Sequence, residues 1–165
     1  MLSAETAVGE YPSQSVSMME RIIKRVERDR LYAEIRITER RLPEATSSDA
    51  ITAAARQVAQ TISAAAIVTF TSSGSTTLRA ARERPTVPIL GLTPIESTAR
   101  RLTLTWGVHS VRTEVLHSFR EMVNKAAMIA KRDEFAQRDN KLVITAGVPF
   151  GTPGTTNILR ISKVK

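Results

Sequence analysis

Six hydroxyl side chains surround a single glycine between Thr71 and Thr77, a composition suited to binding a phosphate. The segment follows a short apolar run typical of a strand and leads into a helix. A helix N-terminus offers free backbone N–H groups and a partial positive charge, and glycine lets the backbone approach a ligand closely. Arg79 and Arg82 on the following helix can add positive charge. A polar turn that only caps the helix is the alternative. The residues predicted to contact a phosphate are Thr71, Ser72, Ser73, Gly74, Ser75 and Thr76.

A second loop, rich in glycine and threonine, runs from Gly147 to Asn157 after another apolar run. Because ligands collect at the carboxyl ends of parallel strands, two hydroxyl-rich loops at one sheet edge would form one pocket. The glycine spacing is not that of a dinucleotide fingerprint, and an ordinary long connection is the alternative. The residues of this loop predicted to line the pocket are Gly151, Gly154, Thr155 and Thr156.

The sequence shows little sign of metal or nucleophile chemistry. It has no cysteine, which excludes a thiolate metal site and fits a reducing compartment. His109 and His117 have no acidic or histidine partner at ligand spacing, so no metal site is predicted. Glu5 and Glu10 have the chemistry of catalytic acids, but they are expected to face solvent. No Ser/His/Asp arrangement typical of nucleophilic catalysis stands out. Taken alone, these residues predict an α/β phosphate-binding module.

Short apolar strands alternate with helices over most of the chain. This alternation predicts a three-layer α/β domain with a mostly parallel five-stranded sheet. The connection between the last two strands has no room for a helix, so the last strand is expected to be antiparallel and at an edge. The expected strands are residues 66–70, 88–93, 108–112, 142–146 and 158–164.

Apolar residues at helical spacing predict a long helix over residues 12–41, with a break near residue 30. One helix cannot bury its own apolar stripe, so other protein must cover this one. The alanine-rich helix expected at 49–65 and the edge strand at 158–164 also have the composition of an interface. Self-association is therefore expected.

The stretch 43–49 begins with proline and has the composition of a linker. Either Ser48 or Asp49 is a suitable cap for the helix that follows. We therefore expect two parts: residues 1–42, and a complete domain over residues 43–165.

Composition and charge restrict the class of protein. The chain has 165 residues and a formal net charge of +8. Residues 1–42 hold 8 basic and 7 acidic residues, whereas residues 43–165 hold 16 and 9, a net charge of +7. That excess attracts anions, but aromatic residues are only 4%, too few to stack single-stranded bases, so a nucleic-acid partner is not expected. Neither a signal peptide nor an apolar run long enough to span a membrane is apparent.

The first twelve residues, MLSAETAVGEYP, resemble the MLSxETAxGxYP segment of pyruvate kinases. Further pieces resemble the same family in the same order, and Val8 with Ala146–Pro149 is most similar to the bacterial forms. These further pieces are 71–76 followed by Arg84-Pro85, 88–94, Trp106–Val108, and 147–157 with its GTTN ending.

The resemblance implies a glycolytic phosphotransferase that makes ATP and pyruvate from phosphoenolpyruvate and ADP with magnesium and potassium. Residues 1–42 would be the end of its β/α barrel, and residues 43–165 its C-terminal domain. The barrel and lid domains would be partners that hold the metal-binding acids and the catalytic lysine. Only Ser3 matches a position at the mouth of the active site, in an auxiliary role, so this chain would hold no cofactor and be inactive alone.

The resemblance also implies regulation. In the family, the loop matching 71–76 grips a phosphate of an allosteric effector, and the loop matching 147–157 closes over it. The effector is fructose 1,6-bisphosphate, AMP or another sugar phosphate, and some members are unregulated. Family members are commonly cytoplasmic tetramers. A free-standing regulatory module that binds a phosphorylated ligand is the alternative function, followed by a nucleic-acid binder.

Overall fold

A computed structural model provides the structure of the chain. The chain divides into two compact units, Met1–Arg41 and Leu42–Lys165, and each is described by itself. The residues that the structure describes are 1–29, 31–32, 35, 43–149 and 155–165.

The first unit contains a short helix, α1 (Ala4–Ala7), and a longer one, α2 (Pro12–Glu27). Pro12 at the first turn needs no hydrogen-bond partner for its nitrogen, which suits a helix start. No residue of α2 is buried, and its apolar side chains, such as Ile22 at 51% exposed, face solvent within the described part of the chain. Helix α2 ends close to the predicted break near residue 30, whereas the rest of the predicted helix lies mostly outside the described residues.

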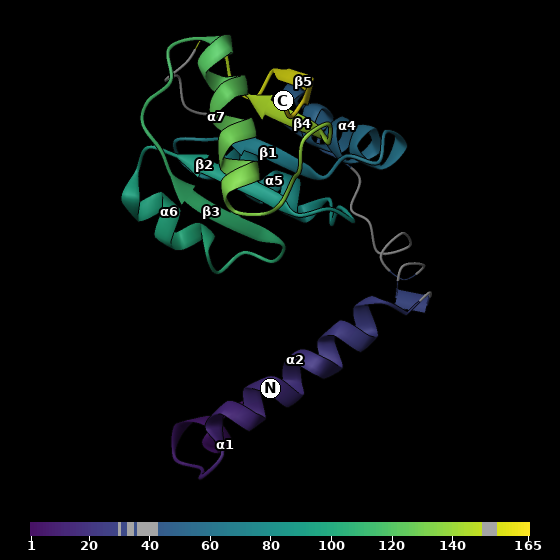
Figure 1. Ribbon diagram of the computed structural model, residues 1–165, viewed down its shortest axis with the longest axis vertical. Helices are drawn as coiled ribbons and strands as arrows, with labels where there is room; N and C mark the ends of the chain where they lie inside the picture. Colours follow the sequence, from purple (N-terminus) through teal and green to yellow (C-terminus); the bar gives the residue numbers. More distant parts are fainter. Residues whose placement is uncertain (30, 33–34, 36–42, 150–154) are drawn as a thin grey trace. The chain divides into compact units, whose positions relative to one another are not determined.

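The second unit is built on one five-stranded sheet in the order β3-β2-β1-β4-β5 (Figure 1). The first four strands are parallel, and β5 pairs antiparallel with β4 at one edge, as predicted. The strand bounds are β1 (Ala66–Phe70), β2 (Ile89–Thr93), β3 (Val108–Arg112), β4 (Lys141–Ala146) and β5 (Ile158–Lys163). The central strands read as nearly continuous apolar runs because helices cover both of their faces.

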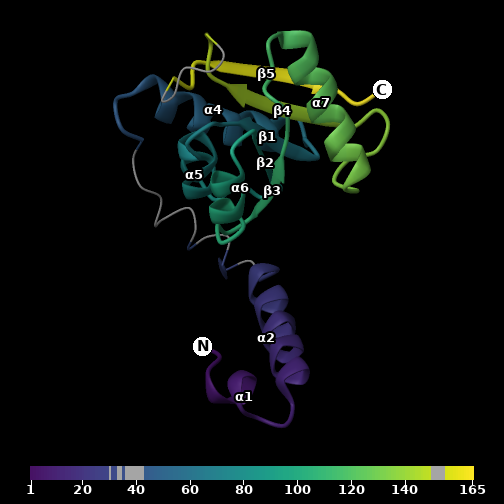
Figure 2. The same cartoon turned by 90° about the vertical axis from the view of Figure 1, so that its left-hand side faces the viewer.

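Helices cover the two faces of the sheet and give the predicted three layers (Figure 2). Helix α7 (Phe119–Arg132) packs Met122 and Ile129 against one face. Helices α4 (Ser47–Thr61) and α5 (Ser75–Arg82) cover the opposite face, where small side chains such as Ala55 and Ala80 allow close packing. Helix α6 (Glu96–Leu102) contacts β2 and β3.

The cap of α4 differs from the one predicted. Thr46, rather than Ser48 or Asp49, is the N-cap, and its Oγ1 accepts a hydrogen bond from the Asp49 N–H at 3.2 Å. The Asp49 carboxylate in turn accepts from the Glu44 N–H at 2.8 Å. This is close to a capping box, in which the N-cap side chain accepts from the N–H three residues later and the acid at that position accepts from the N-cap N–H. Here the acid accepts from the N–H of Glu44 instead. Helix α4 therefore begins at Ser47, two residues earlier than a cap at Ser48 allows and three earlier than a cap at Asp49 allows.

Candidate functional site

The first hydroxyl-rich loop lies where the sequence predicts it, between the carboxyl end of β1 and the start of α5 (Figure 1). Gly74 is the N-cap of α5, and its φ of 93° is in the left-handed region that glycine adopts without strain. Its N–H donates to Thr71 Oγ1 at 2.9 Å, and its carbonyl accepts from the Leu78 N–H at 3.0 Å. The Thr71 side chain therefore bridges the two ends of the loop, and Gly74 directs the chain into α5.

Two side chains of helix α6 donate hydrogen bonds to the same loop. Thr98 Oγ1 donates to the Ser72 carbonyl at 3.0 Å, and Arg101 Nη2 donates to the Ser73 carbonyl at 2.7 Å. Two loop carbonyls, which would repel an anion, are thus engaged by donors from α6. The N–H groups of Thr76 and Thr77, in the first turn of α5, have no partner inside the helix and are the ones that an anion could use.

The second loop meets the first through a pair of buried threonines. Thr76 Oγ1 lies 2.6 Å from Thr156 Oγ1, and the two residues are 5% and 2% exposed. The Thr156 N–H also donates to Ser48 Oγ in the first turn of α4, at 3.3 Å. Next to it, Asn157 exchanges hydrogen bonds of 2.9 and 2.7 Å with the backbone of Val148. The carboxyl ends of β1 and β4 thus bring both predicted loops to one place, together with the N-termini of α4 and α5.

The other residues predicted for the second loop have different positions. Thr155 is exposed beside Thr156, whereas Gly151 and Gly154 lie outside the described residues. In the first loop, Ser73 and Ser75 join their hydroxyls at 3.1 Å at the surface.

The two arginines of α5 are held by acids. Arg79 and Arg82 both hydrogen-bond the carboxylate of Asp49, which is fully buried, and Glu44 lies 3.7 and 4.0 Å from them. Burial opposes ionisation of Asp49, but hydrogen bonds from the Glu44 N–H and the two guanidinium groups outweigh it, so the pKa of this carboxyl is lowered. An unpaired buried carboxylate would be costly, which explains why both arginines turn toward α4. They tie α5 to α4, a role that the sequence analysis did not foresee.

Ser3 belongs to the first unit, where it is exposed and precedes α1. Its carbonyl accepts from Thr6 Oγ1 at 2.9 Å. Hydrogen bonds from the backbone of Glu5 and Ser3 lower the pKa of the neighbouring Glu5 carboxyl. These contacts organise a single helical turn, and they assign no chemistry to Ser3.

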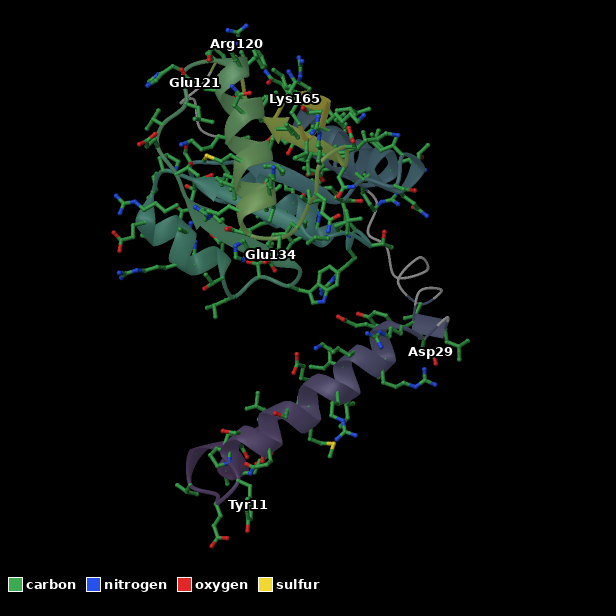
Figure 3. All side chains as sticks on the ribbon, viewed as in Figure 1. Tyr11, Asp29, Arg120, Glu121, Glu134 and Lys165 are labelled. Carbon is green, nitrogen blue, oxygen red and sulfur yellow. The ribbon has the colours of Figure 1, made fainter. Side chains whose placement is uncertain are left out.

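The histidines have partners that sequence spacing did not reveal. His109 Nε2 lies 3.0 Å from Asp133 Oδ2, across the fold from β3 to the end of α7. Arg132 also hydrogen-bonds Asp133, and chiefly for that reason the pKa of this carboxyl falls to about 2. His117 donates its backbone N–H to the Glu121 carboxylate at 2.9 Å, at the start of α7 where Figure 3 shows Glu121.

These contacts are a side-chain hydrogen bond and a helix cap. Among the described residues, no group of three or more His, Asp or Glu side chains could hold a metal. Within the same ranges, no helix has both the length and the apolar character needed to cross a membrane.

Known proteins resemble the whole of this chain. It is 48% identical over 164 residues to a pyruvate kinase of Methylorubrum extorquens and 37% identical over 161 residues to one of Geobacillus stearothermophilus. These matches cover 99% and 98% of this chain but only 34% and 27% of the relatives, so the chain spans about a third of their length.

The fold of the chain is also similar to that of a solved structure. A crystal structure of a pyruvate kinase from Cryptosporidium parvum superposes with a TM-score of 0.87 at 24% identity, over 100% of this chain and 32% of that one. Residues 49–162 match the family model described as "Pyruvate kinase, alpha/beta domain". Because this match covers most of the chain, the protein belongs to the pyruvate kinase family and contains its C-terminal α/β domain.

Proposed function

We propose that residues 43–165 form the effector-binding domain of a pyruvate kinase and bind a phosphorylated small molecule at the two joined loops. The observation that carries this proposal is the contact between Thr76 and Thr156, 80 residues apart in sequence, at the start of α5. It places hydroxyl groups from both loops beside N–H groups that α5 itself leaves unpaired. The field of a helix N-terminus favours an anion at that point. Relatives named pyruvate kinase support the assignment of this domain to such an enzyme.

The proposal predicts that two substitutions in the first loop weaken ligand binding. A hydrogen bond to a charged group contributes about 1.5–3 kcal/mol, so Thr76→Ala should lower affinity roughly 10- to 100-fold. Gly74→Val should lower it further. The obstacle there is the backbone φ of 93°, which a branched residue rarely adopts, because an added Cβ would only make ordinary contact with Thr98 at 3.4 Å.

Calorimetric titration with fructose 1,6-bisphosphate, ribose 5-phosphate and AMP measures this effect. Thr61→Ala is the matched control, since it makes the same change at the exposed end of α4, where the Thr61 hydroxyl bonds only Gln57 among the described residues. Equal affinity of wild type, Thr76→Ala and Gly74→Val for a ligand that binds would place its site elsewhere. Absence of binding by all three compounds would contradict the proposed function.

We also propose that phosphoryl transfer needs barrel and lid domains, with their magnesium and potassium, in addition to this chain. Transfer from phosphoenolpyruvate to ADP depends on positioned cations, and the described residues offer no metal-ligand cluster for them. The isolated 165-residue chain is expected to show no turnover in a coupled assay with phosphoenolpyruvate, ADP, magnesium and potassium. Turnover above that of a blank preparation would contradict this expectation. A cytoplasmic location is part of the same proposal and agrees with the absence of cysteine.

Self-association is the third part of the proposal. Strand β5 has one unpaired edge in the described structure, and Ile161 on it is 49% exposed. The apolar face of α2 is also bare among the described residues, with Ile22 and Val26 about half exposed. Such surfaces favour association, and the family resemblance implies a tetramer. Light scattering at tens of micromolar protein should give a mass above 18.1 kDa, and a monomer alone would contradict the prediction.

A further inference from the structure

A chain of hydroxyl and amide contacts runs from the first loop to the first turn of α4. Thr76 shares a hydrogen bond of 2.6 Å with Thr156, and the Thr156 N–H donates to Ser48 Oγ at 3.3 Å. The three residues come from α5, from the loop before β5 and from α4. Ser48 is therefore the only one of them that lies outside the two predicted loops.

The first turn of α4 is in turn fixed to the residues before it. Thr46 caps the helix, and the Glu44 N–H donates to the Asp49 carboxylate at 2.8 Å. Residues 44–49 thus form one hydrogen-bonded segment, whose acid also holds α5 through Arg79 and Arg82. A displacement of Thr156 would reach this segment through Ser48.

We infer that Ser48 is a positioning residue that couples the second loop to residues 44–49. When an anion occupies the first loop, it tightens the Thr76–Thr156 contact, and the change is passed through the Thr156 amide to Ser48. Residues 44–49 therefore respond to the ligand. This inference rests on the proposed function for its ligand, whereas the role of Ser48 in holding Thr156 stands without one.

Amide hydrogen exchange without any ligand tests the positioning role. Loss of one hydrogen bond costs about 1 kcal/mol, so Ser48→Ala should raise the exchange rate of the buried Thr156 amide about fivefold. Ser48→Thr keeps a hydroxyl and should restore protection. Ser47→Ala, one residue away and exposed, is the matched control and should leave the rate unchanged. Equal exchange in wild type and Ser48→Ala would overturn the inference.

Exchange with a probe ligand tests the coupling. Adding fructose 1,6-bisphosphate, ribose 5-phosphate or AMP to the wild type should slow exchange at residues 71–77, at Thr156 and at 44–49. In Ser48→Ala, protection should appear at 71–77 and be lost at 44–49. Protection of 44–49 that is equal in both proteins would overturn the coupling. If no probe protects the wild type, the proposed function fails, whereas the ligand-free rate at Thr156 still decides the role of Ser48.

Discussion

Replacing Asp49 by alanine should lower the free energy of unfolding by about 3 kcal/mol, because removal of one partner breaks a buried ion-pair cluster. The carboxylate is fully buried and accepts from the Glu44 N–H and from Arg79 and Arg82. The arginines are 31% exposed, so water can solvate them afterwards, which keeps the loss at the lower end for buried pairs. Urea unfolding monitored by circular dichroism measures the change.

Glu44→Ala is the control for this prediction. Glu44 contacts the same two arginines but at 3.7 and 4.0 Å, with its side chain 63% exposed. An exposed pair of this kind contributes about 0–1 kcal/mol, so the loss should be small. A loss of stability as large as that of Asp49→Ala would show that Glu44 contributes as much as Asp49, which would contradict the prediction.

The stability contributed by Asp49 should depend on pH. Its pKa is below the ordinary value of 3.8 in the folded protein, so the folded state binds fewer protons than the unfolded state as pH falls. The contribution is fully present above the unfolded pKa and is lost as pH falls through the folded pKa. Wild type and Asp49→Ala should therefore converge in stability in acid.

Gly147→Ala should be more damaging to the loop than to the sheet. A Cβ at this position would lie 1.7 Å from the carbonyl oxygen of Thr155, a backbone atom that cannot move aside without shifting the segment next to Thr156. Overpacking typically costs about 1–3 kcal/mol, and a clash this close with a backbone atom should lie at the upper end of that range. The Thr76–Thr156 contact should be lost, and binding of any ligand found by titration should fall at least 100-fold, since two or more hydrogen bonds to it are lost.

Gly107→Ala is the control for Gly147→Ala, because it removes a glycine without creating a steric clash. An added Cβ at Gly107 meets nothing within 4 Å, although its φ of 69° makes alanine unfavourable by about 1–2 kcal/mol. This variant should melt at a lower temperature than wild type and bind the ligand normally. Equal melting temperatures and equal affinities for the two variants would contradict the steric argument.

The sequence predicted the fold well because its signals are local. Buried strands such as Ala66–Phe70 are apolar runs, and the short connection before Ile158 leaves room only for an antiparallel strand. Helix ends were predicted less well. The helix expected over residues 49–65 begins at Ser47 and ends at Thr61, since Ser63 takes a φ of 51°, outside the helical region.

The arrangement of the two loops at the candidate site could be predicted for the same reason. Both loops follow strands, so the sequence indicated that they would share a sheet edge, and Thr76 and Thr156 do meet there. The partners of Arg79 could not be predicted, because Asp49 lies 30 residues earlier and faces α5 only after α4 packs on the sheet. The contacts of Ser48 and of α6 depend equally on tertiary structure.

The contacts of α6 with the first loop have a consequence for the thermodynamics of the ligand binding proposed for that loop. Thr98 and Arg101 fix the carbonyls of Ser72 and Ser73 in the protein alone. Fixing the backbone of one residue costs about 1–2 kcal/mol in conformational entropy, and here that cost is met during folding rather than on association. The loop is therefore preorganised, and selectivity among anions of similar charge should come from the enthalpy of the contacts they make there. A substitution in α6, remote from any ligand atom, would appear in calorimetry as an entropic penalty.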